Sequence, residues 1–256
     1  METLLQQLDK GVLVLTINRP NRENRVDRMT GAALRQALEA ARANEAVRSV
    51  VLTGAGGVFC LGGDMDGFPG GSPVQYLNFA RAFGDVLISM SRLGKPLIAA
   101  VNGDALAGGF SLLAGCDMAV ASDAARFGLP ELDYGLFPLL ALAATRELVP
   151  PKFLFEIIYE GRLLNAKEAC AMHLVNRSVP AERVVNEAIS LAERIGLRSS
   201  VAVSIGRDAF YAMRGMTPET AVDYARAALA TMLSTEDGAE AGRAKREGRA
   251  PVFSGR

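Results

Sequence analysis

The feature that most constrains the fold is a glycine-rich turn between two apolar runs. Residues 96–101 are apolar and strand-like, residues 110–114 are apolar and helix-like, and the turn between them, residues 103–109, reads GDALAGG. A turn that leads directly into a helix leaves backbone N–H groups without intrahelical partners, and such groups can bind an anionic oxygen. The sequence therefore predicts a buried strand, a tight turn with free amides, and a buried helix.

The N-terminal part of the chain alternates between strands and helices. Apolar runs at residues 11–18, 48–53 and 118–121 predict three further strands. Helices are predicted at residues 32–42, with Thr30 as the N-cap, and at residues 73–92. Because strands alternate with helices, we expect an α/β protein built from parallel crossover units.

After about residue 135 the sequence predicts mostly helices. The predicted segments are residues 139–148, 151–159, 166–172 (capped by Asn165), 181–194, 200–214 and 218–233. Residues 243–249 are basic, and we interpret them as a solvated tail. We predict an α/β core over residues 1–195 and a helical C-terminal region over residues 196–256.

Composition excludes several classes of function. The chain has 28 basic and 28 acidic residues, a balance that argues against a nucleic-acid binder. Cys60, Cys116 and Cys170 lack CxxC spacing and are predicted to be reduced core thiols. A single histidine, His173, leaves a metal cluster or a Ser-His-Asp triad without its parts. The polar start of the chain and the charges within residues 96–121 predict a cytoplasmic protein without a membrane span. We expect no metal and no permanently bound cofactor.

One carboxylate stands out in an apolar stretch. Residues 127–131 read FGLPE, and further apolar residues follow Glu131. An apolar environment would raise the pKa of this carboxyl group. A carboxylate together with a pair of fixed N–H donors is what enolate chemistry requires. Tyr134 either lines the same pocket or packs in the core.

Eight short motifs occur in a characteristic order. They are NRP at 18–20, LTGAG at 52–56, FCLGGD at 59–64, AVNG at 100–103, GG at 108–109, CD at 116–117, FGLPE at 127–131, and GR…AKEA…LVN between 161 and 176. Together they closely resemble the enoyl-CoA hydratase/isomerase (crotonase) family, over about residues 12–253.

The resemblance implies a fold and a substrate. The fold would be a crotonase-like (ClpP/crotonase) spiral of ββα units with a helical C-terminal trimerisation region. The substrate would be an acyl-CoA thioester, with coenzyme A present only as part of that substrate. The thioester oxygen would lie between the N–H groups of Gly63 and Gly108, with Glu131 as acid/base. The protein would assemble as a homotrimer or a dimer of trimers.

Contacts with coenzyme A are also implied by the resemblance. Cys60, Leu61, Gly62 and Asp64 lie in the motif that contributes to the substrate site. Arg25 stands where family members often have alanine, so it either pairs with a phosphate or is a solvated loop charge.

The chain departs from the family at Ser111. Hydratases of this family carry two glutamates that hold a water molecule, and the first of them is replaced here by Ser111. Asp117 matches a structural position and does not replace the missing glutamate. We therefore favour Δ3,Δ2-enoyl-CoA isomerisation with Glu131 as the only acid/base. A hydratase or a feruloyl-CoA-type hydratase/lyase that uses Glu131 alone, and a non-catalytic CoA-binding protein, remain the alternatives.

Overall fold

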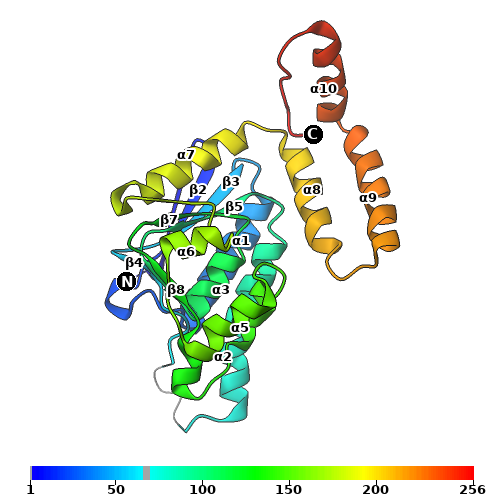
Figure 1. The fold of residues 1–256 in the computed structure, drawn as a ribbon. Helices are drawn as coiled ribbons and strands as arrows, with labels where there is room; N and C mark the ends of the chain where they lie inside the picture. The colour runs from blue at the N-terminus through cyan, green and yellow to red at the C-terminus, as the bar shows by residue number, and fades with distance from the viewer. Residues whose placement is uncertain (1, 66–69) are drawn as a thin grey trace.

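The computed structural model describes residues 2–65 and 70–256, which form two β-sheets covered by helices (Figure 1). In the described residues, the larger sheet has the order β1 (Leu4–Asp9), β2 (Val12–Ile17), β3 (Ser49–Gly54), β5 (Leu97–Val101), β7 (Met118–Ser122) and β10 (Arg177–Val179). The smaller sheet has the order β4 (Val58–Cys60), β6 (Asp104–Leu106), β8 (Arg126–Gly128) and β9 (Leu164–Asn165). The strands predicted at residues 11–18, 48–53, 96–101 and 118–121 are confirmed as β2, β3, β5 and β7.

The central strands of the larger sheet are buried on both faces. Every residue of β3 and β5 is buried, which explains their continuous apolar sequence. Two clusters of apolar side chains cover the two faces, and the smaller cluster lies between this sheet and α7 (Val184–Gly196). This sheet therefore supports the short strands β4, β6 and β8, which follow β3, β5 and β7 in the chain.

The described helices agree closely with the predicted ones. In addition to α7 they are α1 (Arg28–Ala43), α2 (Pro73–Ser91), α3 (Gly108–Ala114), α4 (Leu139–Thr145), α5 (Pro151–Glu160), α6 (Ala166–Ala171), α8 (Ser200–Ala212), α9 (Pro218–Leu233) and α10 (Glu236–Glu247), with 3-10 turns η1 (Pro20–Arg22), η2 (Pro130–Tyr134) and η3 (Ala181–Arg183). Asn165 caps α6 as predicted. The predicted cap of α1 is wrong: Asp27 accepts hydrogen bonds from the Thr30 amide and hydroxyl, at 2.8 and 2.7 Å, so Thr30 lies inside the first turn.

The elements repeat as a spiral. β3, β4 and α2 follow one another, as do β5, β6 and α3, and each repeat places one strand in each sheet before its helix. The ββα spiral that the resemblance implied is therefore confirmed. Sequence analysis missed β4, β6 and β8, and it also missed β1, which pairs antiparallel with β2 at the sheet edge.

Helices α8–α10 form an arm that extends away from the sheets in Figure 1. Its root is fixed by Arg207 of α8, which donates to Asp117 Oδ2 at 2.8 Å and to the Met90 carbonyl at 2.7 Å. Asp117 also accepts from the Leu97 amide at 2.8 Å and from the Tyr211 hydroxyl at 3.0 Å. These contacts give Asp117 the structural role that the sequence predicted. The predicted boundary between residues 195 and 196 falls at the end of α7 and stays a prediction.

Residues 243–249, predicted to be a solvated tail, are exposed apart from Ala244, but they are not an irregular tail. Most of this segment belongs to α10, and Arg243 and Arg249 both bind Glu240, with donor–acceptor distances of 3.0 and 3.1 Å. The hydrogen bonds from Arg249 and from the Val252 amide lower the pKa of Glu240 to about 2. The end of the chain is thus folded back onto the last helix.

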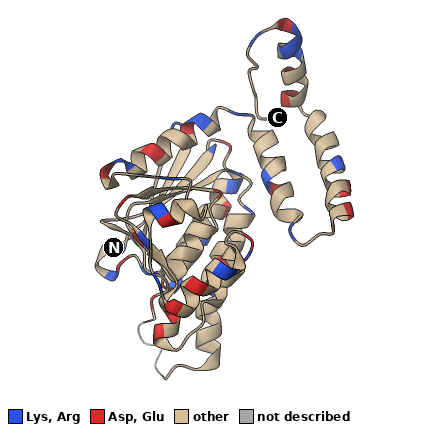
Figure 2. Cartoon of the chain, viewed as in Figure 1, with Lys and Arg blue, Asp and Glu red and all other residues tan. Residues whose placement is uncertain are grey.

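Charges of both signs are interspersed along the helices, whereas the sheet strands carry few of them (Figure 2). Among the helices in the described ranges, none has the length and apolarity that a bilayer crossing needs.

Candidate active site

Three successive strands of the smaller sheet end at the same edge. β4 runs parallel to β6, and β6 runs parallel to β8. Gly63 follows the end of β4, Gly108 follows the end of β6, and Glu131 follows the end of β8. In parallel α/β sheets, ligands bind at this carboxyl edge of the strands. The topology therefore brings the two predicted amide donors and the predicted acid/base to one side of the sheet.

The amide of Gly63 is directed away from its neighbouring segment. The Val26 amide donates to the Gly62 carbonyl at 2.8 Å, and the Asp64 amide donates to the Val26 carbonyl at 3.0 Å. Because the groups on both sides of Gly63 face Val26 in this parallel bridge, the Gly63 N–H faces the opposite way. Within the described residues this N–H has no acceptor. A free, outward-facing amide is what an oxyanion donor requires.

The amide of Gly108 is exposed by an unusual turn at the preceding residue. Ala107 has φ +51° and ψ −122°, a conformation that non-glycine residues rarely adopt. Its own N–H donates to the Gly128 carbonyl at 2.9 Å, which ties this turn to the end of β8. The Gly108 N–H at the start of α3 has no acceptor among residues 2–65 and 70–256. It is therefore available to a ligand, as the role predicted for Gly108 requires.

Close packing explains why both donors are glycines. A Cβ atom on Gly63 would lie 2.4 Å from Cζ of Phe79, and one on Gly108 would lie 2.8 Å from Cζ of Phe83. A Cβ on Gly62 would lie 3.1 Å from the Gly108 nitrogen, so the two loops are in direct contact. Phe79 and Phe83 are one turn apart on α2, and sequence analysis missed them. Their spacing of four residues within the helix predicted at 73–92 was the available signal.

Glu131 is half-buried, and one of its carboxyl oxygens has no hydrogen-bond partner among the described residues. It lies on η2, and its Oε2 atom is buried with no partner in the described part of the chain. Burial raises its pKa from 4.5 to about 7 because the charged form loses hydration. The raised pKa predicted from its apolar sequence is confirmed. A carboxyl group with this pKa can both accept and return a proton near neutral pH.

Ser111 occupies the buried face of α3. It is fully buried, and its Oγ lies 3.5 Å from the Ala107 carbonyl, one turn earlier in the helix. A serine hydroxyl does not ionise near neutral pH without a base to activate it, and Ser111 has no such base among its described hydrogen-bond partners. The group at this position is therefore neutral and carries no second carboxylate.

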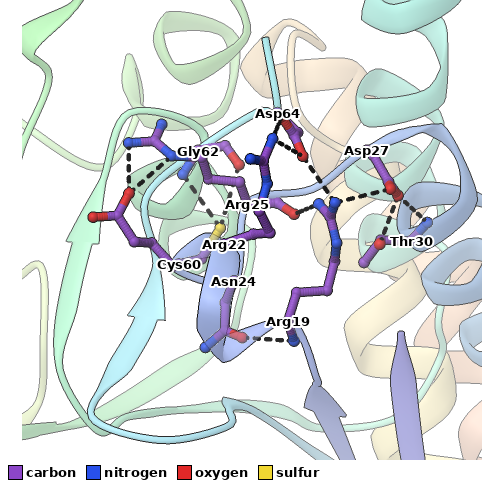
Figure 3. A network of polar contacts seen from close by, with 10 residues as sticks. Arg19, Arg22, Asn24, Arg25, Asp27, Thr30, Cys60, Gly62 and Asp64 are labelled. Carbon is purple, nitrogen blue, oxygen red and sulfur yellow. Dashed lines mark hydrogen bonds and ion pairs between the residues drawn. The ribbon is translucent and has the colours of Figure 1, made fainter. Parts of the chain in front are cut away.

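A network of arginines and carboxylates surrounds the loop that carries Gly63 (Figure 3). The Asp64 carboxylate is buried and binds Arg19 at 2.8 Å and Arg22 at 3.1 Å. Arg19 also binds Asp27, the cap of α1, at 3.1 Å. Asp64 thus joins the loop after β4 to the start of α1, and its carboxylate is already occupied by cations.

The other residues expected to contact coenzyme A are divided between the interior and the surface. Cys60 is fully buried, whereas Tyr134 at the end of η2 is 78% exposed. Arg25 is half-buried and donates to the Leu61 carbonyl at 2.8 Å. The structure thus places Cys60, Leu61 and Arg25 around the same loop, and it places Tyr134 outside that group. All three cysteines are free, and only Cys60 is completely buried.

The buried residue Asn24 was missed by sequence analysis. It has φ +54°, and its side-chain amide donates to the carbonyls of Ala55 and Val58 at 2.9 and 2.7 Å. Asparagine is enriched in this left-handed conformation, so its place after an arginine-proline turn was a usable signal. Asn24 holds the loop after β2 against β4.

Comparison with known proteins agrees with this geometry. The family model for enoyl-CoA hydratase/isomerase matches residues 7–256. Enoyl-CoA hydratase EchA19 of Mycobacterium tuberculosis is 31% identical over 95% of this chain and 93% of its own length. (E)-benzylidenesuccinyl-CoA hydratase of Thauera aromatica is 30% identical over 97% and 98%. The crystal structure of enoyl-CoA hydratase from Mycobacterium smegmatis superposes with a TM-score of 0.95, at 32% identity, and covers 99% of both chains. The fold is therefore that of crotonase, and the chain belongs to the enoyl-CoA hydratase/isomerase family.

Proposed function

We propose that this protein is a Δ3,Δ2-enoyl-CoA isomerase in which Glu131 is the only acid/base. The observation that carries the proposal is the composition of the site: one half-buried carboxyl group with a pKa of about 7, and a neutral serine where a second carboxylate would be needed. Moving one proton between two carbon atoms requires a single group that can accept and return it. Adding water requires, in addition, a group that holds and activates the water.

The proposed reaction uses Glu131 twice. Its carboxylate removes a proton from C2 of a 3-enoyl thioester, and the electron pair of that C–H bond forms a dienolate whose negative charge lies on the thioester oxygen. The carbonyl then re-forms, the double bond moves from C3–C4 to C2–C3, and C4 takes the proton back from Glu131. The product is the 2-enoyl thioester, and Glu131 is again ionised.

The amides of Gly63 and Gly108 would stabilise the dienolate. Both are free of protein acceptors in the described residues, and the loops that carry them are in contact. Fixed main-chain donors in a site that excludes water stabilise a developing oxyanion by about 3 kcal/mol each. The apolar rings of Phe79 and Phe83 against these glycines support such a water-poor site.

Hydration is the second candidate. The relatives named above are hydratases, which favours addition of water by this chain as well. In that case Glu131 would act alone on a water molecule, with or without later cleavage of the adduct to an aldehyde as in feruloyl-CoA hydratase/lyases. A CoA-binding protein without turnover is the remaining outcome of the test.

The experiment that distinguishes these reactions measures the mass and the deuterium content of the products. Wild type and Glu131→Gln are incubated in deuterated water with 3-enoyl-, 2-enoyl- and feruloyl-CoA, and the products are identified by mass spectrometry. Isomerisation predicts double-bond migration with no gain of water, lost in the variant. The deuterium content at C4 then measures how often the proton on Glu131 exchanges with solvent before it is returned. A gain of one water molecule, or an aldehyde product, would overturn isomerisation in favour of hydration or lyase chemistry. Binding of the esters without turnover would overturn both.

A further inference from the structure

The segment that carries the first oxyanion donor is held by two side chains that the proposed reaction does not use. Residues 60–63 run from the end of β4 to Gly63. Gly62 has φ +100°, a backbone conformation that only glycine adopts readily. Its carbonyl accepts a hydrogen bond from the Val26 amide at 2.8 Å, which orients the peptide that ends in the Gly63 N–H, and two side chains add further contacts. Cys60 and Arg25 contact the segment from two directions (Figure 3).

Cys60 closes a small ring with Gly62. The Gly62 amide donates to Cys60 Sγ at 3.4 Å, and the thiol donates to the Gly62 carbonyl at 3.6 Å. Burial raises the pKa of Cys60 to about 12, so the thiol keeps the proton it donates. The backbone of Cys60 also touches the second loop, because a Cβ on Gly109 would lie 1.9 Å from the Cys60 carbonyl oxygen. Cys60 thus contacts both the loop that carries Gly63 and the start of the helix that carries Gly108.

Arg25 holds the preceding peptide. Its Nη1 donates to the Leu61 carbonyl at 2.8 Å, and its Nε donates to the Glu23 carboxylate at 3.0 Å. The backbone carbonyl of Arg25 accepts a hydrogen bond from Arg19, which also binds Asp64. The guanidinium therefore bonds to the residue two positions before Gly63, and the backbone of Arg25 is tied to the residue immediately after it.

We infer that Cys60 and Arg25 are positioning residues that, together with the main-chain bridge to Val26, fix the direction of the Gly63 N–H. The inference rests on the proposed function, because it assumes that this N–H binds the thioester oxygen. Neither side chain has to touch the substrate for this role. Loss of either one would leave the donor present but misdirected, which lowers kcat more than it raises KM. We expect kcat to fall by between about 10-fold and 100-fold, less than for complete loss of an oxyanion donor.

The test measures the polarisation of a bound thioester rather than turnover alone. Crotonyl-CoA labelled with carbon-13 at the thioester carbonyl is bound to Glu131→Gln protein, and the C=O stretching frequency is recorded by difference infrared spectroscopy. Cys60→Ala and Arg25→Met are then introduced into that background, with Cys60→Ser as the conservative variant. Cys116→Ala removes a different thiol, bonded to the Leu112 carbonyl at 3.4 Å, and serves as the matched control.

The inference predicts a lowered C=O frequency in the Glu131→Gln protein that returns toward the free value in Cys60→Ala and Arg25→Met. Cys60→Ser should recover most of the shift, and Cys116→Ala should keep all of it. An unchanged shift in both test variants would overturn the inference while leaving the oxyanion hole intact. Weaker binding of CoA by Arg25→Met, with less dependence on salt than in the Glu131→Gln protein and with an unchanged shift, would make Arg25 a phosphate contact instead. Absence of any shift in the Glu131→Gln protein would count against the proposed function itself.

Discussion

At the scale of single residues, the proposed chemistry depends on a carboxyl group whose surroundings disfavour its charged form. Glu131 has a buried oxygen without a described partner, and burial raises its pKa to about 7. The same burial makes the carboxylate a stronger base, because a group with a higher pKa binds the abstracted proton more tightly. Two measurable consequences follow, one in the rate and one in stability.

The rate should follow the ionisation of Glu131. Proton abstraction needs the carboxylate, so kcat/KM should rise with pH below about 7 and level off above it. Glu131→Gln should lower kcat by about 1,000-fold or more. Steady-state rates with a 3-enoyl-CoA between pH 5 and 9 provide the check. A profile that stays flat down to pH 5 would contradict the assignment.

The stability of the folded protein should fall as pH rises, whereas the rate should rise. The folded-state pKa of Glu131 lies above its ordinary value of 4.5, so the folded protein gains stability from protonation at low pH and loses it as pH rises through about 7. Glu131→Gln should therefore increase the free energy of unfolding at pH 8 by about 1–3 kcal/mol, and by nearly nothing at pH 4. Urea unfolding at the two pH values tests this. An equal increase in the free energy of unfolding at pH 4 and at pH 8 would mean that the substitution acts through packing rather than through charge.

Ala107 offers a test of backbone strain beside the second donor. Its φ of +51° with ψ −122° suits glycine far better than alanine. Ala107→Gly should increase the free energy of unfolding by about 1 kcal/mol, even though glycine gains more entropy when the chain unfolds. Thermal unfolding monitored by circular dichroism gives the answer. A lower melting temperature would mean that contacts of the Ala107 methyl group outweigh the strain.

At the scale of elements, the strands that position the site were the least predictable part. β4, β6 and β8 have three residues each, too few for an alternating or continuous apolar pattern to appear. Glycines flank β4 and β6, and sequence analysis interpreted residues 103–109, which contain β6, as a turn. The long buried strands and the helices had strong periodic patterns and were predicted well. The second sheet followed only from the family resemblance.

The site residues that lie in sequence motifs could be predicted, whereas those whose roles depend on tertiary contacts could not. Gly63, Gly108 and Glu131 lie in recognisable sequence segments, and the topology brings those segments to one sheet edge. The roles of Arg25 and Cys60 depend on which carbonyl lies beside them after folding. No periodicity encodes such a contact, because its partners are fixed by the tertiary fold.

The packing of α3 on β4 can be tested with one methyl group. A Cβ on Gly109 would lie 1.9 Å from the Cys60 carbonyl oxygen, and neither backbone can move freely. Gly109→Ala should lower the free energy of unfolding by about 3 kcal/mol or more and should abolish activity by separating the two donor loops. Gly206→Ala is the matched control, because a Cβ there, in α8, meets nothing within 4 Å. Equal effects of the two substitutions would refute the close approach.

At the scale of the whole molecule, the arm formed by α8–α10 exposes more apolar surface than a helix in contact with water normally does. α9 has no buried residue, and Val222, Leu229 and Leu233 are 51%, 54% and 65% exposed along one face. Such a face is normally covered by other protein. With the family resemblance, this supports the proposal that the arm assembles the protein into a homotrimer or a dimer of trimers.

Assembly can be measured directly. Light scattering coupled to size-exclusion chromatography should give three or six times the chain mass of 27.1 kDa for the wild type. A double variant, Leu229→Asp with Leu233→Asp, should shift the protein toward single chains, because charged side chains cannot be buried in an apolar contact at low cost. Exchange of the exposed Asp223 for Asn in the same helix is the control. A wild type that elutes as a single chain would contradict the proposal.

The oxyanion donors belong to the main chain, and this has a consequence for how such a protein diverges. Every amino acid except proline leaves a peptide N–H at its position, so a point mutation to any other residue cannot delete the donor but only displace it. The carboxylate at position 131 and the hydroxyl at position 111 are side chains, and each can be exchanged by a single codon change. Proteins that descend from one ancestor can thus all keep the capacity to stabilise an enolate, while substitutions at positions 111 and 131 change how that enolate reacts.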